Sequence, residues 1–189
     1  MIALGKRLKI LDGALAVFEA KGFHAAAVPE IAAASSVAVG TIYRHFPTKE
    51  ALGEALLAAW QERFNADVLA PYPATATPRA ALRLTWRRMA GFARSFPAAQ
   101  RFLDLHHHAS YAGPASAAAE AALHQGMREL ADWGRRQGVM KPLPPEALTA
   151  LLRGSLAGLA RYAAVAGVIP QTLIDDMEDC LWNAVATRT

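Results

Sequence analysis

A short stretch in the first quarter of the chain gathers side chains that could contact nucleic-acid bases and phosphates. The candidates are Val39, Gly40, Thr41, Tyr43, Arg44, His45 and Lys49. Threonine offers a hydroxyl and a methyl group, both of which can meet base edges, and glycine lets a backbone come close. Lys49 lies at the expected start of a helix, where free N–H groups already favour a phosphate. These residue types permit nucleic-acid binding if a fold presents them on one free face.

The rest of the chain offers little for catalysis. It contains no Gly-x-Ser-x-Gly elbow, no phosphate-cradling glycine loop and no paired-cysteine pattern, and Cys180 lies on an apolar helical stripe typical of a core. We therefore predict no catalytic residue, no cofactor and no enzyme activity.

A run of three histidines, His106-His107-His108, invites a metal interpretation. Consecutive residues on a helix point about 100° apart, so these three cannot converge on one ion without a ligand from a second helix, such as His124. We predict no metal site and interpret His106 or His107 as a polar group that faces a pocket.

Apolar spacing predicts three helices before residue 46, over Leu4–Lys21, Pro29–Ala34 and Ala38–His45. Gly22 supplies a stop for the first, and the residue before Pro47 is pushed out of helical geometry, which ends the third. A tight turn over 35–37 joins the two short helices. Their shared apolar core, Ile31, Ala32, Val37 and Ile42, leaves one face of the third helix free, which is typical of a helix-turn-helix.

Six longer helices are expected beyond this unit. Thr48 caps the first of them, which runs to about Val68, and a proline-rich break over 71–78 follows. The others are expected over Arg79–Phe96, Ala98–Tyr111, Ser116–Gln137, Glu146–Ala166 and Thr172–Ala186. No segment alternates apolar with polar residues at strand period, so we predict an all-α fold. Its domains are a helix-turn-helix over 1–50 and a larger helical domain over 51–189.

Composition narrows the class of protein. The 189 residues are 53% hydrophobic and include one cysteine, which predicts a large core without an internal disulfide. The N-terminus has no secretory pattern, so a cytoplasmic location is expected. Charged residues and glycines interrupt the longest apolar run, over 148–169, which makes it a poor membrane span. The net charge of +4 permits nucleic-acid binding without establishing it.

Four segments of the sequence are more specific than the composition. The segments ILDGALAVFEAKGFH (10–24), EIA (30–32), GTIYRHF (40–46) and KEAL (49–52) resemble the N-terminal domain of the tetracycline-repressor (TetR) family over about residues 7–56. The remainder resembles the family's C-terminal domains more loosely, with FLDLHHH (102–108) similar to a segment of some branches. The resemblance implies a homodimeric regulator, a repressor released from palindromic operator DNA by a small apolar effector. It places Thr41 and Tyr43 at DNA-contacting positions, His45 at the end of the reading helix and Lys49 on a phosphate, with Val39 and Arg44 as further candidates.

The sequence also departs from the family pattern. The usual polar or glycine residues are replaced by Ala27, Pro29, Ser36, Ala38 and Val39, which removes several potential contacts. Weaker affinity or an unusual operator becomes plausible, with Lys6, Arg7 and Lys9 supplying part of the electrostatics. A dimerisation module that has lost DNA binding therefore stays open as an alternative.

Two further sites are expected in the C-terminal part. Large side chains that could line an effector pocket are Trp60, Phe64, Trp86, Met89, Phe92, Phe102, His106, Met127 and Trp133, although core packing accounts for most of them individually. The eighth and ninth helices carry apolar stripes, with Gly154 and Gly158 four residues apart on the eighth. By resemblance these two helices form a four-helix dimer interface, and packing within one chain is the alternative.

Overall fold

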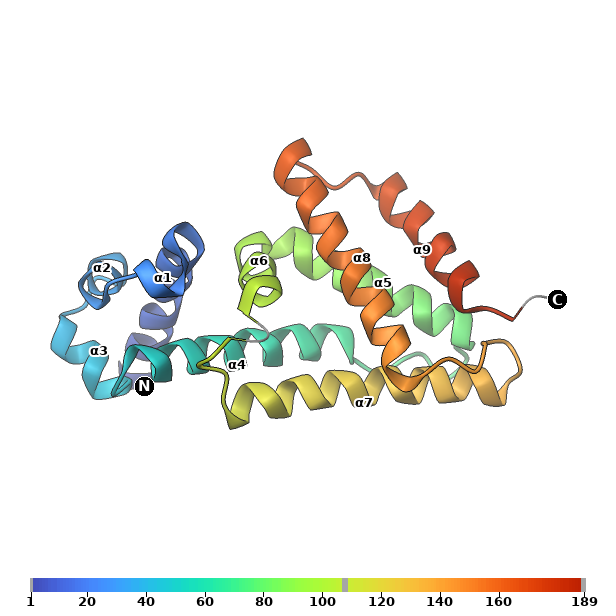
Figure 1. Ribbon diagram of the computed structural model, residues 1–189, viewed down its shortest axis with the longest axis horizontal. Coiled ribbons are helices and arrows are strands. Elements are labelled where there is room, and N and C mark those ends of the chain that lie inside the picture. Colours follow the sequence, from blue (N-terminus) through green and yellow to red (C-terminus); the bar gives the residue numbers. More distant parts are fainter. Residues whose placement is uncertain (1, 107–108, 188–189) are drawn as a thin grey trace. The chain divides into compact units, whose positions relative to one another are not determined.

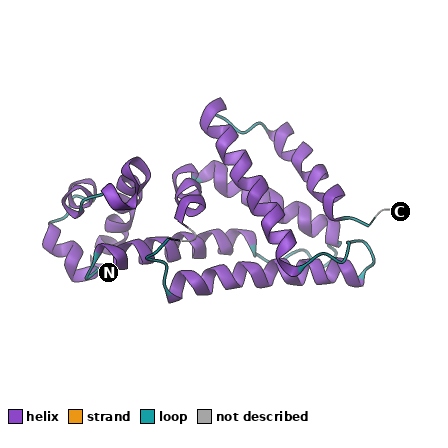
Figure 2. Cartoon of the chain, in the orientation of Figure 1, coloured by secondary structure: helices purple, strands orange, loops and turns teal. Residues whose placement is uncertain are grey.

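The computed structural model describes residues 2–106 and 109–187, and within these ranges the regular secondary structure is helical apart from one isolated bridge between Met140 and Ala186 (Figures 1 and 2). The predicted all-α fold is confirmed. The helices are α1 (Ile2–Ala25), α2 (Val28–Ala34), α3 (Val39–His45), α4 (Lys49–Val68), α5 (Pro78–Ser95), α6 (Pro97–His106), α7 (Pro114–Arg136), α8 (Pro145–Ala166) and α9 (Gln171–Val185). None of these described helices is long and apolar enough to cross a membrane.

The described residues form two compact units. The first unit lies within Met1–Glu62 and Ala98–Ala119, and the second unit lies within Arg63–Pro97 and Glu120–Thr189. Helix α6 therefore belongs to the same unit as the three N-terminal helices, whereas α5, α8 and α9 pack with one another in the second unit. The predicted domain boundary after residue 50 stays a prediction.

Aromatic contacts join α6 and the residues after it to α1 inside the first unit. Phe18 stacks on Phe102 at 6.3 Å between ring centroids, and Phe23 lies 4.1 Å from Tyr111. The ring of His106 lies 4.6 Å from that of Phe102 and 5.8 Å from that of Tyr111. Burial in this cluster raises the pKa of Tyr111 and lowers the pKa of His106, the latter with a smaller contribution from His24.

The second unit is held by α5 and α9. Trp86 is fully buried, and its indole Nε1 donates to the carbonyl of Ile174 at 2.9 Å. Arginines of α5 pair with acids of α9, including Arg87 with Asp175 at 2.9 Å and with Glu178 at 3.0 Å. A buried donor and a set of ion pairs thus fix how α9 lies on α5.

Proline positions account for the main errors in the predicted helix ends. The sequence predicts helices over Ala98–Tyr111 and Ser116–Gln137, but α6 ends at His106, and Pro114 is the first residue of α7. Proline lacks an N–H that the first helical turn does not need, so it begins a helix as readily as it ends one. The same holds for Pro78, Pro97 and Pro145.

Candidate nucleic-acid interface

The predicted helix-turn-helix is present in the first unit. Ile31, Ala32 and Ile42 are buried between its helices, as expected, and Val37 is half-buried. Ser36 in the turn has φ 53°, a left-handed conformation that favours glycine. The turn therefore keeps its geometry although a serine replaces the usual glycine.

Gly13 lets α1 approach the turn closely. A Cβ added there would lie 2.1 Å from Ser35 Oγ and 2.9 Å from the Ser35 backbone nitrogen. The Ser35 hydroxyl in turn donates to the Ile31 carbonyl at 2.6 Å. The sequence analysis missed this position, although a glycine inside an apolar helical pattern is a known sign of close backbone approach.

Helix α3 presents a solvent face opposite its buried Ile42. Gly40, Tyr43 and Arg44 are exposed, and a Cβ added at Gly40 would meet nothing within 4 Å. Val39, Thr41 and His45 are half-exposed at the edges of this face. Tyr43 is 49% exposed, so it is not a core residue packed against α1. Six of the seven predicted contact residues are therefore accessible on one short helix.

The seventh residue, Lys49, lies differently. Its ammonium group donates to the carbonyls of Phe23 at 2.9 Å, His24 at 3.2 Å and Ala26 at 3.2 Å, and it lies 4.7 Å from the centroid of the Phe23 ring. A lysine has three N–H donors, and all three are used inside the chain. The structure thus gives Lys49 a role in fixing the end of α1 to the start of α4, which the resemblance did not suggest.

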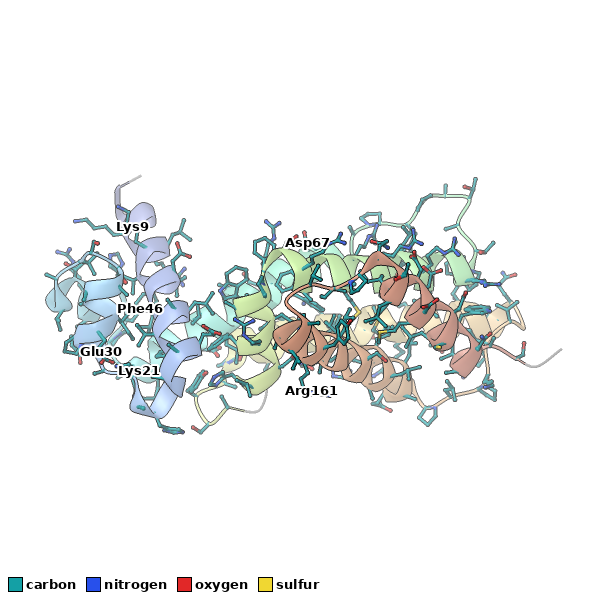
Figure 3. The ribbon with its side chains drawn as sticks, turned by 90° about the horizontal axis from the view of Figure 1, so that it is seen from above. Lys9, Lys21, Glu30, Phe46, Asp67 and Arg161 are labelled. Carbon is teal, nitrogen blue, oxygen red and sulfur yellow. The ribbon has the colours of Figure 1, made fainter. Side chains whose placement is uncertain are left out.

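Charged groups around the helix-turn-helix divide into paired and unpaired ones. Lys21 pairs with Glu30 at 2.5 Å (Figure 3), and this hydrogen bond, with a second one from the Ala27 N–H, lowers the pKa of Glu30. Lys6, Lys9 and Arg44 are without an acidic partner among the described residues. The Arg7 guanidinium lies 5.4 Å from the centroid of the buried Phe46 ring. The free cations leave a positive surface for phosphates.

The predicted pocket residues divide between the two units. Phe102 and His106 belong to the aromatic cluster of the first unit. Trp60, which is half-exposed, also lies in the first unit. The second unit holds Phe64, Trp86, Met89, Phe92 and Met127, all buried, and Trp133, which is half-exposed. Phe64 and Phe92 contact each other edge to face at 5.1 Å. Whether they line an effector pocket stays a prediction.

The apolar and small residues of α8 and α9 form two sets on each helix, one buried in the chain and one facing outward. Leu148, Leu152, Leu156 and Leu159 are buried in the second unit, as are Ile174, Leu181 and Val185 of α9. A second, outward set is half-exposed or exposed and comprises Leu151, Gly154, Gly158, Tyr162 and Val165 on α8 and Leu173, Met177, Cys180 and Ala184 on α9. The predicted single stripe thus mixes residues that pack inside the chain with residues that do not.

Glu54 is a structural residue that the sequence analysis did not identify. Its carboxylate accepts hydrogen bonds from the backbone N–H groups of Gly113, Ala115 and Ser116 and from the Ser116 hydroxyl, all within the first unit. It satisfies free donors at the start of α7, where the helix dipole also favours a negative charge. No local pattern marks it, because its partners lie about sixty residues away.

Among the described residues, no group of three or more His, Cys, Asp or Glu side chains is placed to hold a metal ion. His107 and His108 lie outside the described residues.

Comparisons with known proteins identify both parts of the chain. Residues 10–56 match the family model described as bacterial regulatory proteins, tetR family, and residues 58–187 match the model of the tetracyclin repressor-like C-terminal domain. The second match alone covers more than half of the chain.

Individual relatives agree with these matches. The HTH-type transcriptional regulator UidR of Escherichia coli is 40% identical over 57 residues, which are 30% of this chain and 29% of UidR. The HTH-type transcriptional repressor KstR of Mycolicibacterium smegmatis is 39% identical over 61 residues, 32% of this chain and 30% of KstR. The matched segment thus spans less than a third of the length of either relative.

Solved structures are similar over nearly the whole chain. A protein described as a tetR family transcription regulator from Shewanella sp. PV-4 has a TM-score of 0.81 and 26% identity, covering 97% of this chain and 99% of that one. A TetR family regulator from Marinobacter aquaeolei VT8 has a TM-score of 0.86 and 22% identity, covering 97% of both chains.

Proposed function

The chain belongs to the tetR family of bacterial regulatory proteins, and we propose that it is a homodimeric transcriptional repressor that leaves palindromic operator DNA when a small apolar effector binds. The observation that best supports DNA binding is the solvent-exposed face of α3. Gly40, Tyr43 and Arg44 stand clear of a closed three-helix core, at a spacing that puts them on one side of the helix. Such a face fits a major groove.

Thr41 and Tyr43 supply base contacts in this proposal, and Arg44, Lys6 and Lys9 supply phosphate contacts. Selection of bound sequences from a random duplex library tests it, with an enriched near-palindromic site as the expected result. Thr41→Ala and Tyr43→Phe should then change the selected sequence, whereas Lys9→Ala should weaken binding to all sequences alike. Retention of no duplex at low salt would favour the alternative, a dimerisation module without DNA binding.

Two hypotheses for the role of Lys49 can be separated with one variant, Lys49→Ala. A phosphate contact predicts that Lys49→Ala lowers the slope of log affinity against log salt by about 0.9. A clamp between α1 and α4 predicts a lower free energy of unfolding and an unchanged slope. We expect the second result, because the three ammonium donors already have carbonyl acceptors. An unchanged unfolding curve with a reduced slope would contradict it.

The outward faces of α8 and α9 support the homodimer. Added Cβ atoms at Gly154 and Gly158 would meet nothing within 4 Å, and Val165 is 91% exposed. Exposed apolar side chains beside small ones suit close packing with a second copy, which would give a four-helix interface. Sedimentation should show a dimer at micromolar concentration, and Gly158→Arg should dissociate it while the fold is retained. A monomeric parent protein would contradict this part of the proposal.

An unpartnered polar atom supports a small-molecule effector in the second unit. Thr149 Oγ1 of α8 is buried and lacks a hydrogen-bond partner in the described part of the chain. Buried polar atoms usually have partners, and an effector could supply them. The proposed effector binds within residues 58–187 and favours a dimer whose recognition helices no longer match the roughly 34 Å spacing of successive major grooves.

The effector hypothesis has a reciprocal test. A compound found by thermal-shift screening should lower operator affinity about fivefold to a hundredfold, and operator DNA should weaken the compound by the same factor. Equal binding of the compound with and without operator would contradict an effector-controlled repressor.

A further inference from the structure

The second unit contains a pocket of about 460 Å³, a volume within the range of small-molecule sites. Helix α7 contributes Gln125, Gly126, Glu129 and Trp133 to its lining, and the segment after α4 contributes Leu69 and Tyr72. Trp133 is the one residue that this lining shares with the predicted effector pocket. The other lining residues are not among those predicted for the effector pocket.

Contacts within the chain hold the pocket residues after α4 in place. The Tyr72 hydroxyl shares a hydrogen bond with Thr85 Oγ1 at 2.7 Å, and the Arg88 guanidinium lies 5.4 Å from the centroid of the Tyr72 ring. Arg88 also donates to the carbonyls of Ala70 and, at 3.0 Å, Pro71. The phenol ring is thus held from two sides, which reduces the entropy lost when a ligand packs on it.

Gly126 of α7 lies directly against the Leu69 side chain. A Cβ added at Gly126 would lie 2.5 Å from Leu69 Cδ2, so a larger residue there would push this side chain aside. Gly126, Glu129 and Trp133 follow at intervals of three and four residues, which places them on one face of the helix.

The lining has a distinct charge pattern. Glu129 is its one formally charged side chain, and the Gln125 amide donates to the Glu129 carboxylate at 2.9 Å. Glu129 is exposed, and the Trp133 indole and the Tyr72 phenol ring line the same pocket. Arg88, whose guanidinium lies against the Tyr72 ring, has its N–H groups directed to the backbone carbonyls of Val68, Ala70 and Pro71.

We propose that this pocket binds an organic cation, an ammonium or amidinium group carried on an apolar body. Aromatic faces attract a cation through their quadrupole, and a carboxylate adds a direct electrostatic attraction. The apolar body would pack on Leu69 and Trp133. This inference does not depend on DNA binding, and it is tested without DNA.

Calorimetric titration at constant ionic strength compares three probes of similar size. Benzyltrimethylammonium carries the charge, neopentylbenzene is its neutral carbon isostere, and 3-phenylpropionate carries the opposite charge. The cation should bind about tenfold tighter than the neutral isostere, and the anion should not bind measurably. Equal affinity of the cation and the neutral compound, or no binding of the cation, would overturn the proposal.

Variants locate the site. Glu129→Gln keeps the shape and the hydrogen bond to Gln125, and it should weaken the cation roughly threefold to thirtyfold while leaving the neutral probe unchanged. Glu146→Gln is the matched control, because Glu146 is an exposed glutamate of α8 outside the pocket. Ala122→Leu, at an exposed lining alanine, should block all probes in the same titration. An equal loss in Glu129→Gln and Glu146→Gln would also overturn the proposal.

Discussion

The arginines of helix α5 and the cations around helix α3 differ in what they contact. In α5, Arg79 pairs with Asp179 at 3.3 Å, Arg87 pairs with Asp175 at 2.9 Å, and Arg83 and Arg87 share the buried carboxylate of Glu178. Around α3, Lys6, Lys9 and Arg44 are exposed and lack an acidic partner in the described residues.

This difference separates a structural role from a binding role. The number of basic residues does not locate a DNA surface, since α5 is richer in arginine than α3. The basic residues of α5 and those around α3 differ in whether they pair with carboxylates. A cation already neutralised by a carboxylate gains little from a phosphate. The two regions also differ in how they are held, since α5 and α9 use ion pairs and an indole hydrogen bond, whereas α1 and the turn before α3 rely on close backbone approach at Gly13.

The largest effect is expected from Gly13→Ala. Its Cβ would collide with the Ser35 side chain and backbone nitrogen, so the free energy of unfolding should fall by about 1 to 3 kcal/mol in urea titrations. Gly91→Ala is the control on α5, where an added Cβ meets nothing within 4 Å and a neutral or slightly stabilising change is expected. Similar losses in both variants would show that close approach is not what holds the turn.

A smaller loss is expected from Glu178→Gln. Glu178 is 7% exposed and pairs with two arginines that are about half-exposed, so their partial solvation limits the cost to about 1 to 2 kcal/mol of unfolding free energy. The salt dependence of DNA binding should not change, because these charges are structural. Asp179→Asn, which removes an exposed partner, should cost less than half as much. A changed salt slope in Glu178→Gln would contradict the division between paired and free cations.

Gly40→Ala should affect DNA binding without affecting the fold. The added methyl group meets nothing inside the chain, and alanine favours a helix, so the unfolding free energy should stay equal or rise. If the duplex backbone approaches α3 at this point, operator affinity should fall roughly tenfold in equilibrium binding measurements. An unchanged affinity would mean that the duplex does not approach α3 at Gly40.

The smallest effect concerns pH. Burial, and to a lesser extent His24, holds the pKa of His106 below its usual value of 6.5. The unfolded chain therefore takes up this proton first as the pH falls, and the folded state loses stability. The contribution is fully present above about pH 6.5 and is lost below it as the pH falls through the lowered pKa. Unfolding free energies of the parent and of His106→Gln, measured across this range, should converge at acidic pH, and parallel curves would contradict the assignment.

Local signals in the sequence predicted the elements near the candidate site well. The helix capped by Thr48 begins at Lys49, with the Thr48 hydroxyl accepting from the Ala51 N–H at 3.0 Å, and α3 ends at His45 because Phe46 precedes a proline. The accessible face of α3 followed from the apolar pattern alone. Helix ends next to other prolines were less predictable, since Pro114 begins a helix that the sequence pattern placed two residues later.

By itself the sequence determined the all-α fold, the helix-turn-helix and the family, because caps, prolines and apolar periodicity act within a few residues of one another. Tertiary structure alone decided that Lys49 binds three carbonyls, that Leu148, Leu152, Leu156 and Leu159 of α8 turn inward while Leu151 and Tyr162 do not, and that Glu54 caps α7. These outcomes depend on groups that lie tens of residues apart along the chain. Their contacts are set by how whole helices pack, and no local pattern encodes that packing.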